Sequence, residues 1–127
     1  MGQQQLLLIV LGVIIVGIAV VVGINLFNAN ATNANRDGVI SDLNNLGAMA
    51  QQFYKKPTSM GGGGNTFTGW TIPTGLDSTA NGTYAPTVAA QTVTLVGLGT
   101  EKGTDGTNPV KATGTVTGST ITVAVNN

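Results

Sequence analysis

Residues 6–24 read LLLIVLGVIIVGIAVVVGI, which is nineteen consecutive residues without a polar side chain. A buried helix in a small soluble domain carries a polar stripe, and a strand is much shorter than this stretch. About twenty apolar residues span the hydrocarbon core of a bilayer. In lipid, or among apolar neighbours, the backbone must satisfy its hydrogen bonds internally, which favours helix despite the many Ile and Val residues. The stretch therefore predicts a long helix, made to be buried in lipid or against copies of itself.

Charge is sparse and confined to the later part of the chain. Five basic and five acidic residues give a formal net charge of zero, and only 8% of residues are charged. All ten lie at or after Arg36. The densest basic cluster, Lys55-Lys56, is too small for phosphate binding, which needs several clustered cations. We therefore expect no nucleic-acid binding.

Residue types that carry most protein chemistry are missing. The chain has no cysteine and no histidine, which excludes disulfides and thiol nucleophiles and removes the commonest metal ligands. Without histidine, the abundant Ser and Thr hydroxyls lack an obvious activating base. The glycine run 61–64 is not followed by Gly-Lys-Ser/Thr, so the phosphate-binding loop pattern fails. We expect neither enzyme activity nor a bound cofactor or metal.

The remaining polar groups favour structural roles. Asp37 and Asp42 lie near the expected start of a second helical segment and are interpreted as capping or solvating groups. Glu101 and Asp105 fall in a turn-rich loop and are interpreted as solvated charges. Two N-glycosylation acceptor patterns, 30–32 (Asn-Ala-Thr) and 81–83 (Asn-Gly-Thr), are most simply chance matches in an Asn- and Thr-rich chain.

A second helical pattern follows the apolar stretch. Residues 28–38 are Asn-rich, with low helix propensity, and predict a hinge or a loosened helix. From residue 39 to 56, apolar residues recur at alternating spacings of four and three, which is typical of a one-sided amphipathic helix. Pro57 ends this pattern after two lysines that suit a helix C-terminus. The apolar positions of this stripe are Val39, Leu43, Leu46, Ala50 and Phe53.

Residues 57–127 show period-two patterns and turns, which predict strands. We expect a strand at 66–72 with a bulge at Gly69, a strand at 92–96, and a hairpin at 113–125 that turns at Gly118-Ser119. Trp70 is expected in the core between helix and sheet together with the other aromatic residues Phe53, Tyr54 and Phe67, and an exposed sugar-binding platform is the less favoured alternative.

The predicted fold is α+β. A long N-terminal helix, apolar in its first half and amphipathic in its second, packs at its distal half on a small antiparallel sheet. The predicted divisions are an apolar helix at 1–27, the hinge at 28–38, and a globular domain at 39–127 built of the helix 39–56 and the β-rich segment 57–127. The residues expected to join helix and sheet are Val39, Leu43, Leu46, Phe53 and Trp70.

This arrangement resembles type IV pilin subunits. The similarity covers residues 1–56 in sequence pattern, including QQFYKKP at 51–57, and the rest only in architecture. The resemblance implies that a prepilin peptidase removes a short leader, and that Met1 is the mature, N-methylated terminus. It also implies a subunit that waits in the membrane and then joins an extracellular homopolymer through an inner-membrane assembly machinery. The filament core would include Gln5, Leu8, Leu11, Ile15, Val16, Val20 and Ile24.

The sequence departs from the bacterial pilin pattern at several positions. Bacterial pilins typically have glutamate at the fifth mature position, where this chain has Gln5. A leader cut after Gly2 would instead place Leu7 there. The usual proline near position twenty-two is absent, so unwinding between Gly17 and Gly23 is a weaker expectation, and the pilin disulfide loop is missing. Archaeal pilins and flagellins, many of which lack the glutamate, are the closest alternative.

Three functions fit these patterns. The favoured one is a major pilin whose apolar helices bundle in a filament core. The others are a membrane-anchored monomeric binding domain and a pilus-like component (pseudopilin) of a secretion machine. An anchor usually has basic residues flanking its span, and none precedes Arg36, which favours self-packing.

Overall fold

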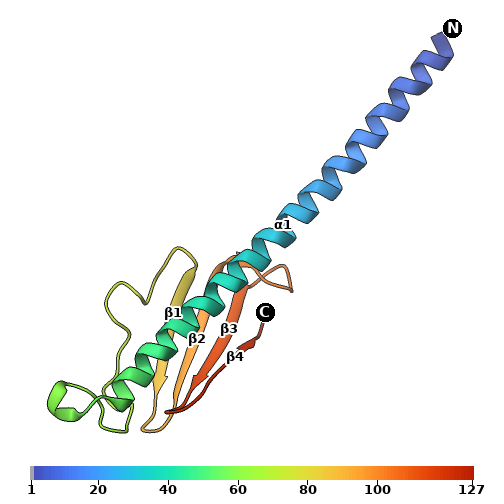
Figure 1. Ribbon diagram of the computed structural model, residues 1–127. Helices are drawn as coiled ribbons and strands as arrows, with labels where there is room; N and C mark the ends of the chain where they lie inside the picture. Colours follow the sequence, from blue (N-terminus) through green and yellow to red (C-terminus); the bar gives the residue numbers. More distant parts are fainter. Residues whose placement is uncertain (1) are drawn as a thin grey trace. The chain divides into compact units, whose positions relative to one another are not determined.

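The computed structural model describes residues 2–127, and its first element is a single helix, α1 (Gly2–Lys55), of 54 residues (Figure 1). The chain divides into two compact units, one ending at Ala31 and the other running from Thr32 to Asn127. The segment 28–38, predicted as a hinge or loosened helix, is helical throughout. Thr32 and Asn35 in this segment form hydrogen bonds with the sheet domain, and such tertiary contacts routinely override a low helix propensity.

The second unit contains a four-stranded antiparallel sheet in the order β1-β2-β3-β4. A short 3₁₀ turn, η1 (Thr58–Met60), and a long loop separate α1 from the sheet. Each strand follows its neighbour along the chain, so the sheet is a simple meander. Its strands are β1 (Gly82–Val88), β2 (Val93–Lys102), β3 (Pro109–Val116) and β4 (Ile121–Val125).

One face of this sheet packs on the C-terminal half of α1 and encloses the core (Figure 1). The helix contributes its apolar stripe, and the strands contribute alternate residues, as the pleat of a sheet requires. At Gly97 an added Cβ would lie 2.8 Å from Val39 Cγ1, so this glycine lets the helix come close to β2. The strand residues of the core are Tyr84, Val93, Leu95, Ala112 and Val116. The predicted α+β fold is confirmed.

Two strand predictions hold. The predicted strand at 92–96 is the first half of β2, which runs on to Lys102. The predicted hairpin at 113–125 is formed by β3 and β4, and Thr117 N–H donates to Thr120 C=O at 2.8 Å across the turn. Gly118 and Ser119 therefore form the predicted two-residue loop.

The strand predicted at 66–72 is wrong. Phe67 and Trp70 are both buried, and residues three apart in a strand point to opposite faces. A tight turn solves this problem, because Trp70 N–H donates to Phe67 C=O at 2.9 Å and Gly69 adopts a φ of 90°. Both aromatic side chains thus reach the same core, and Gly69 serves a turn instead of a bulge.

The first strand of the sheet was not predicted. β1 has the sequence GTYAPTV, in which Tyr84 is the only large side chain that is buried. It also contains Pro86, which argues against a central strand. β1 lies at the edge of the sheet, where β2 is its one neighbouring strand and its other side forms only an isolated bridge between Thr83 and Ser78, so Pro86, which has no N–H, is tolerated there.

Candidate assembly surface

The first unit is a helix whose apolar side chains all face outward. Among residues 2–30 every position is exposed. The helix is long and apolar enough to cross a membrane by length and composition. Apolar residues surround its axis, so it lacks the polar stripe of a helix that packs on one side only. The predicted core residues Leu8, Leu11, Ile15, Val16, Val20 and Ile24 are each more than half exposed, and Gln5 is exposed as well.

This surface creates a strong drive towards burial. Removing one Val, Leu or Ile side chain from water is worth about 1.5–3 kcal/mol. Contiguous apolar patches of this kind mark membrane or protein interaction sites. Gly17 and Gly23 are helical here, and a Cβ added at either would meet nothing within 4 Å. They leave shallow places on the surface where another backbone can approach closely. Met1, the predicted site of processing, lies outside the described residues.

The second unit, in contrast, has buried most of its large apolar side chains, with Met60, Leu98 and Val125 as the exposed ones. Val39 and Leu43 are fully buried, and Leu46 and Trp70 are 2% and 6% exposed. Phe53 is half-buried and packs against this core. The five residues predicted to join helix and sheet therefore lie in one cluster. The second unit therefore has a core of its own, whereas every residue from 2 to 30 is exposed.

Asn35 ties the helix to the end of β2. Its side chain is 8% exposed, and its Oδ1 accepts the backbone N–H groups of Thr100 at 3.1 Å and Glu101 at 3.2 Å. Its Nδ2 donates to Asn81 C=O at 2.7 Å. The sequence places Asn35 four residues before Val39, on the line of the apolar stripe, and that position was the signal of burial that composition alone obscured.

A second polar contact joins the middle of the helix to the loop before β1. Asp42 Oδ2 accepts hydrogen bonds from Tyr84 Oη at 2.5 Å, Thr79 Oγ1 at 2.8 Å and Asn81 Nδ2 at 3.1 Å. The predicted capping role of Asp42 is wrong, because α1 does not begin there. This carboxylate inside the helix instead holds the end of the loop before β1 (Thr79 and Asn81) and the side chain of Tyr84 near the start of β1.

These contacts change the acidity of both partners. Burial alone would raise the pKa of Asp42, but the hydrogen bonds from Tyr84, Thr79 and Asn81 outweigh it and hold the pKa below its ordinary value of 3.8. For Tyr84, burial and then the hydrogen bond to the Asp42 carboxylate raise the pKa well above its ordinary value of 10.0. Asp42 therefore stays ionised and Tyr84 protonated around neutral pH, which is the pair of states that this contact needs.

The turn between β2 and β3 is organised by Asp105. Its Oδ1 accepts the backbone N–H groups of Thr107 at 2.9 Å and Asn108 at 3.0 Å, and its Oδ2 accepts Asn108 Nδ2 at 2.8 Å. These hydrogen bonds, led by the one from Thr107, hold the pKa of Asp105 far below its usual range. Asn127 Nδ2 donates to the same Oδ1 at 3.2 Å, which ties the segment after β4 into this turn.

The aromatic side chains do not form an exposed platform. Phe67 and Trp70 are buried, and the rings of Tyr54 and Phe67 are 4.7 Å apart between centroids, tilted by 35°. Tyr54 Oη donates to Gln91 Oε1 at 2.9 Å. Phe67 and Trp70 therefore lie in the core and Phe53 and Tyr54 pack against it, which disfavours the sugar-binding platform.

The two asparagines of the glycosylation patterns differ in accessibility. Asn81 Nδ2, the atom that would carry a glycan, donates to Asp42, and its side chain lies where Gly38 leaves room for it. A glycan at Asn81 would break that contact. Asn30 is exposed on the helix, so its side chain is accessible.

Over residues 2–127, no three Asp, Glu, His or Cys side chains are grouped so that they could hold a metal ion. Comparison of the chain with models of protein families, with curated protein sequences and with solved structures finds no match. The molecule joins an exposed apolar helix to a small domain with a core of its own.

Proposed function

We propose that the protein is the structural subunit of an extracellular helical filament of the type IV pilus kind. The observation that carries the proposal is the first unit, whose apolar side chains face outward on all sides of the helix. A bundle of parallel copies buries such a surface completely, since each helix then has apolar neighbours all round. The domains, which have closed cores and little net charge, form the sheath.

The same helix also suits a subunit that waits in the membrane before assembly. Its length and composition match a bilayer span. Transfer of the helix from lipid to the bundle exchanges one apolar environment for another. Packing and hydrogen bonds between helices therefore decide whether the subunit stays in the membrane or joins the filament. In this proposal a prepilin peptidase processes the subunit, and a membrane-bound machinery adds subunits to the filament.

Substitution of Val16 by Lys tests the bundled core. A charge in the middle of an apolar bundle is costly, so we expect the variant to form no filaments in sheared surface material viewed by electron microscopy. Thr115→Lys provides the control. Thr115 is exposed on β3, so this substitution introduces the same charge outside the proposed bundle. Unchanged filaments from Val16→Lys would disprove the bundled core.

The alternative is a single-pass anchor that presents the domain as a monomer. The membrane-length helix favours it as well. The two functions differ in the state of the wild-type protein at the cell surface. An anchor stays in the membrane fraction as a monomer after shearing, whereas a filament subunit is released in long polymers.

A further inference from the structure

A pocket of about 310 Å³ lies in the second unit, between α1 and the loop that leads to β1. Side chains from residues 42–52 of α1 and from residues 76–79 of the loop line it, and we call it the 42–79 pocket. Small-molecule sites occupy roughly 300–1,000 Å³, so this volume suits a small ligand. Because the pocket lies wholly within the second unit, its occupancy does not depend on filament assembly.

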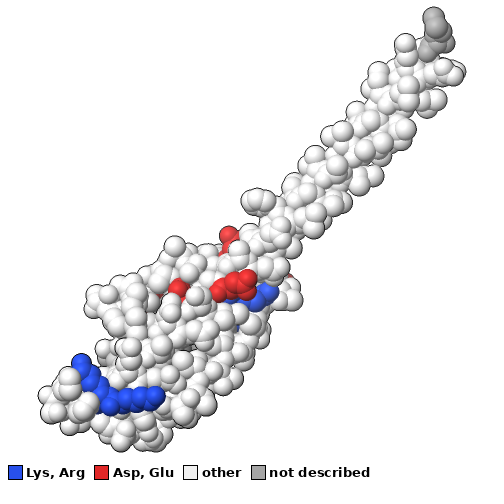
Figure 2. Space-filling model, in the orientation of Figure 1, with Lys and Arg blue, Asp and Glu red and all other residues white. Residues whose placement is uncertain are grey.

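The pocket contains one negative charge. Asp42 lines it, and none of the described residues that line it is Lys or Arg. The three donors to Asp42 Oδ2 are neutral and leave the charge in place. The other oxygen, Oδ1, accepts no hydrogen bond from residues 2–127 and is open to solvent. Figure 2 shows that most of the visible surface of the molecule is uncharged, so a free carboxylate oxygen in a pocket differs sharply from its surroundings.

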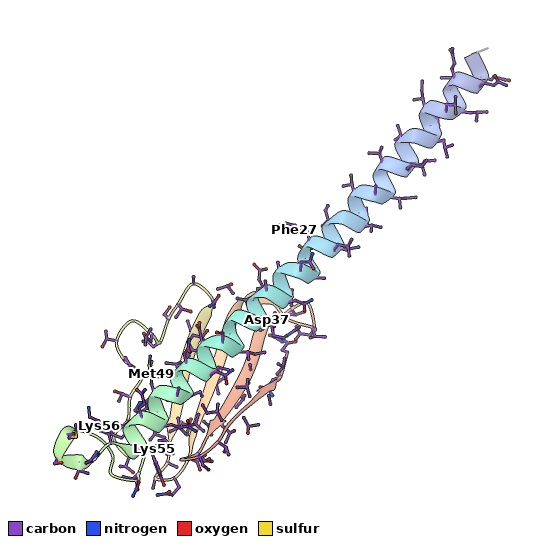
Figure 3. All side chains as sticks on the ribbon, viewed as in Figure 1. Phe27, Asp37, Met49, Lys55 and Lys56 are labelled. Carbon is purple, nitrogen blue, oxygen red and sulfur yellow. The ribbon has the colours of Figure 1, made fainter. Side chains whose placement is uncertain are left out.

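Three other side chains that line the pocket are apolar and belong to the margin of the core. Leu46 is 2% exposed, and Met49 and Leu76 pack against the buried cluster. Figure 3 shows Met49 between Asp37 and Lys55 on the C-terminal half of α1. An apolar group bound against these three side chains leaves water, which favours binding.

The charge and the apolar wall together select the class of ligand. Asp42 repels an anion, and a neutral apolar molecule would take water away from its Oδ1 without offering a partner, which costs free energy. A primary ammonium group has three N–H donors and forms charge-assisted hydrogen bonds with a carboxylate. Asn45, three residues after Asp42 and on the same side of the helix, lines the pocket and offers an amide oxygen to a second N–H.

The order of these groups along the helix sets the shape of the ligand. Asp42, Leu46 and Met49 follow one another at spacings of four and three, so they lie along one line of α1. Asp42 and Met49 are about 10 Å apart along the axis, at ~1.5 Å per residue. We propose that the 42–79 pocket binds a primary alkylammonium ion, with its charge at Asp42 Oδ1 and its alkyl chain along Leu46, Met49 and Leu76.

Titration of pentylammonium into the isotopically labelled full-length chain in neutral detergent tests this site, because amide chemical shifts report where a ligand binds. We expect saturable shifts confined to residues 42–52 and 76–79, with a Kd of about 0.1–1 mM for so small a ligand. Pentan-1-ol has the same alkyl chain without the charge and should bind about tenfold more weakly or less. Equal binding of the two compounds would overturn the role of Asp42.

Two variants test the carboxylate in different ways. Asp42→Asn keeps the shape of the side chain but removes its charge, and should weaken pentylammonium binding about tenfold. Because Asp42 also holds Thr79 and Tyr84, the second variant leaves it in place. Ala48→Arg adds a cation at an exposed position that lines the pocket, and should weaken binding about three- to tenfold by competing for Asp42. Thr115→Arg adds the same charge at an exposed position on β3, outside the pocket, and should bind like wild type.

A second probe distinguishes two sources of the same chemistry. Nα-acetyl-lysine amide carries an alkylammonium group on a peptide backbone. Tighter binding of this probe than of pentylammonium assigns the pocket to a lysine side chain of another protein, and weaker binding assigns it to a free amine. The site itself is overturned if pentylammonium causes no saturable shifts at the pocket, or if Asp42→Asn and Ala48→Arg both bind it like wild type.

Discussion

Asp42 shows how this domain keeps a carboxylate in a helix that packs on a sheet. Three neutral donors converge on one oxygen: Thr79 and Asn81 lie in the loop before β1, and Tyr84 lies in β1 itself. The Asp42 side chain therefore joins α1 to the segment around Tyr84, about forty residues later in the sequence. Its charge is compensated by hydrogen bonds, which are stronger when the acceptor is ionised.

Tyr84→Phe removes the shortest of these hydrogen bonds and leaves the ring in place. We expect a loss of about 1–2 kcal/mol in the free energy of unfolding, the range for a hydrogen bond to a charged group. Thermal unfolding of the full chain in detergent, followed by near-ultraviolet circular dichroism of Trp70, measures it. An unchanged midpoint would show that the Oη contact contributes nothing.

The acidity of Asp42 also predicts a pH dependence. Its pKa is lowered in the fold, so the unfolded chain binds the proton more tightly and folding is favoured while the carboxylate is ionised. That stabilisation is full above the ordinary pKa of 3.8 and is lost as pH falls through the lower, folded value. Asp42→Asn should flatten the acid side of a stability–pH curve. Asp105→Asn is the control for the other lowered carboxylate, and removes its own part of the same window.

Gln5 bears on how the N-terminal ammonium is accommodated in a filament. An unpaired ammonium in an apolar core costs several kcal/mol, and a glutamine carbonyl can accept a hydrogen bond from it without cancelling its charge. Gln5→Leu should therefore assemble poorly. Gln5→Glu should assemble well near neutral pH but lose assembly as pH falls below about 4–5, where the carboxylate is protonated. If Leu assembles as well as wild type, measured by sedimentation across pH, Gln5 has no role in solvating the amine.

At the scale of elements, the strongest periodicities predicted the structure best. The stripe from Val39 to Phe53 predicted both the helix and its buried face, and alternation with a Gly-Ser turn predicted the last hairpin. The failures have a common physical cause. Residues 66–72 alternate between polar and apolar like a strand, but a turn lets both Phe67 and Trp70 reach the core. β1 contains too few apolar residues for its sequence pattern to predict a strand. Neither outcome is encoded locally, since both depend on where the core lies.

The close packing of α1 on β2 predicts that adding one methyl group at Gly97 lowers stability. Gly97→Ala would put a Cβ 2.8 Å from Val39 Cγ1, which forces the helix and β2 apart. We expect a loss of about 1–3 kcal/mol in unfolding free energy, as for other overpacked cores. Gly114→Ala on the adjacent strand is a matched control, because its Cβ would meet its nearest neighbour at an ordinary 3.8 Å. Equal midpoints for the two variants in thermal unfolding would show that the helix moves at little cost.

At the scale of the whole molecule, sequence alone separated an apolar helix from a domain, and the structure adds polar contacts near the predicted boundary. Composition suggested a hinge at 28–38 with the domain beginning at Val39. The compact unit begins instead at Thr32, whose Oγ1 donates to Lys102 C=O at 3.0 Å. Polar contacts across the domain are invisible to hydrophobic periodicity, so this boundary could not be found from the apolar pattern.

Two fragments test that boundary. A fragment of residues 32–127 keeps Thr32, Asn35 and Arg36 with their partners, and we expect it to be a soluble, folded monomer, since the apolar surface of residues 6–27 is gone. A fragment of residues 39–127 loses several hydrogen bonds worth about 0.5–1.5 kcal/mol each. Its thermal midpoint should therefore be lower by about 10 °C or more, given ~4–8 °C per kcal/mol for a domain of this size. Equal midpoints would place the boundary at Val39 after all, and aggregation of the 32–127 fragment would show that the domain surface also drives association.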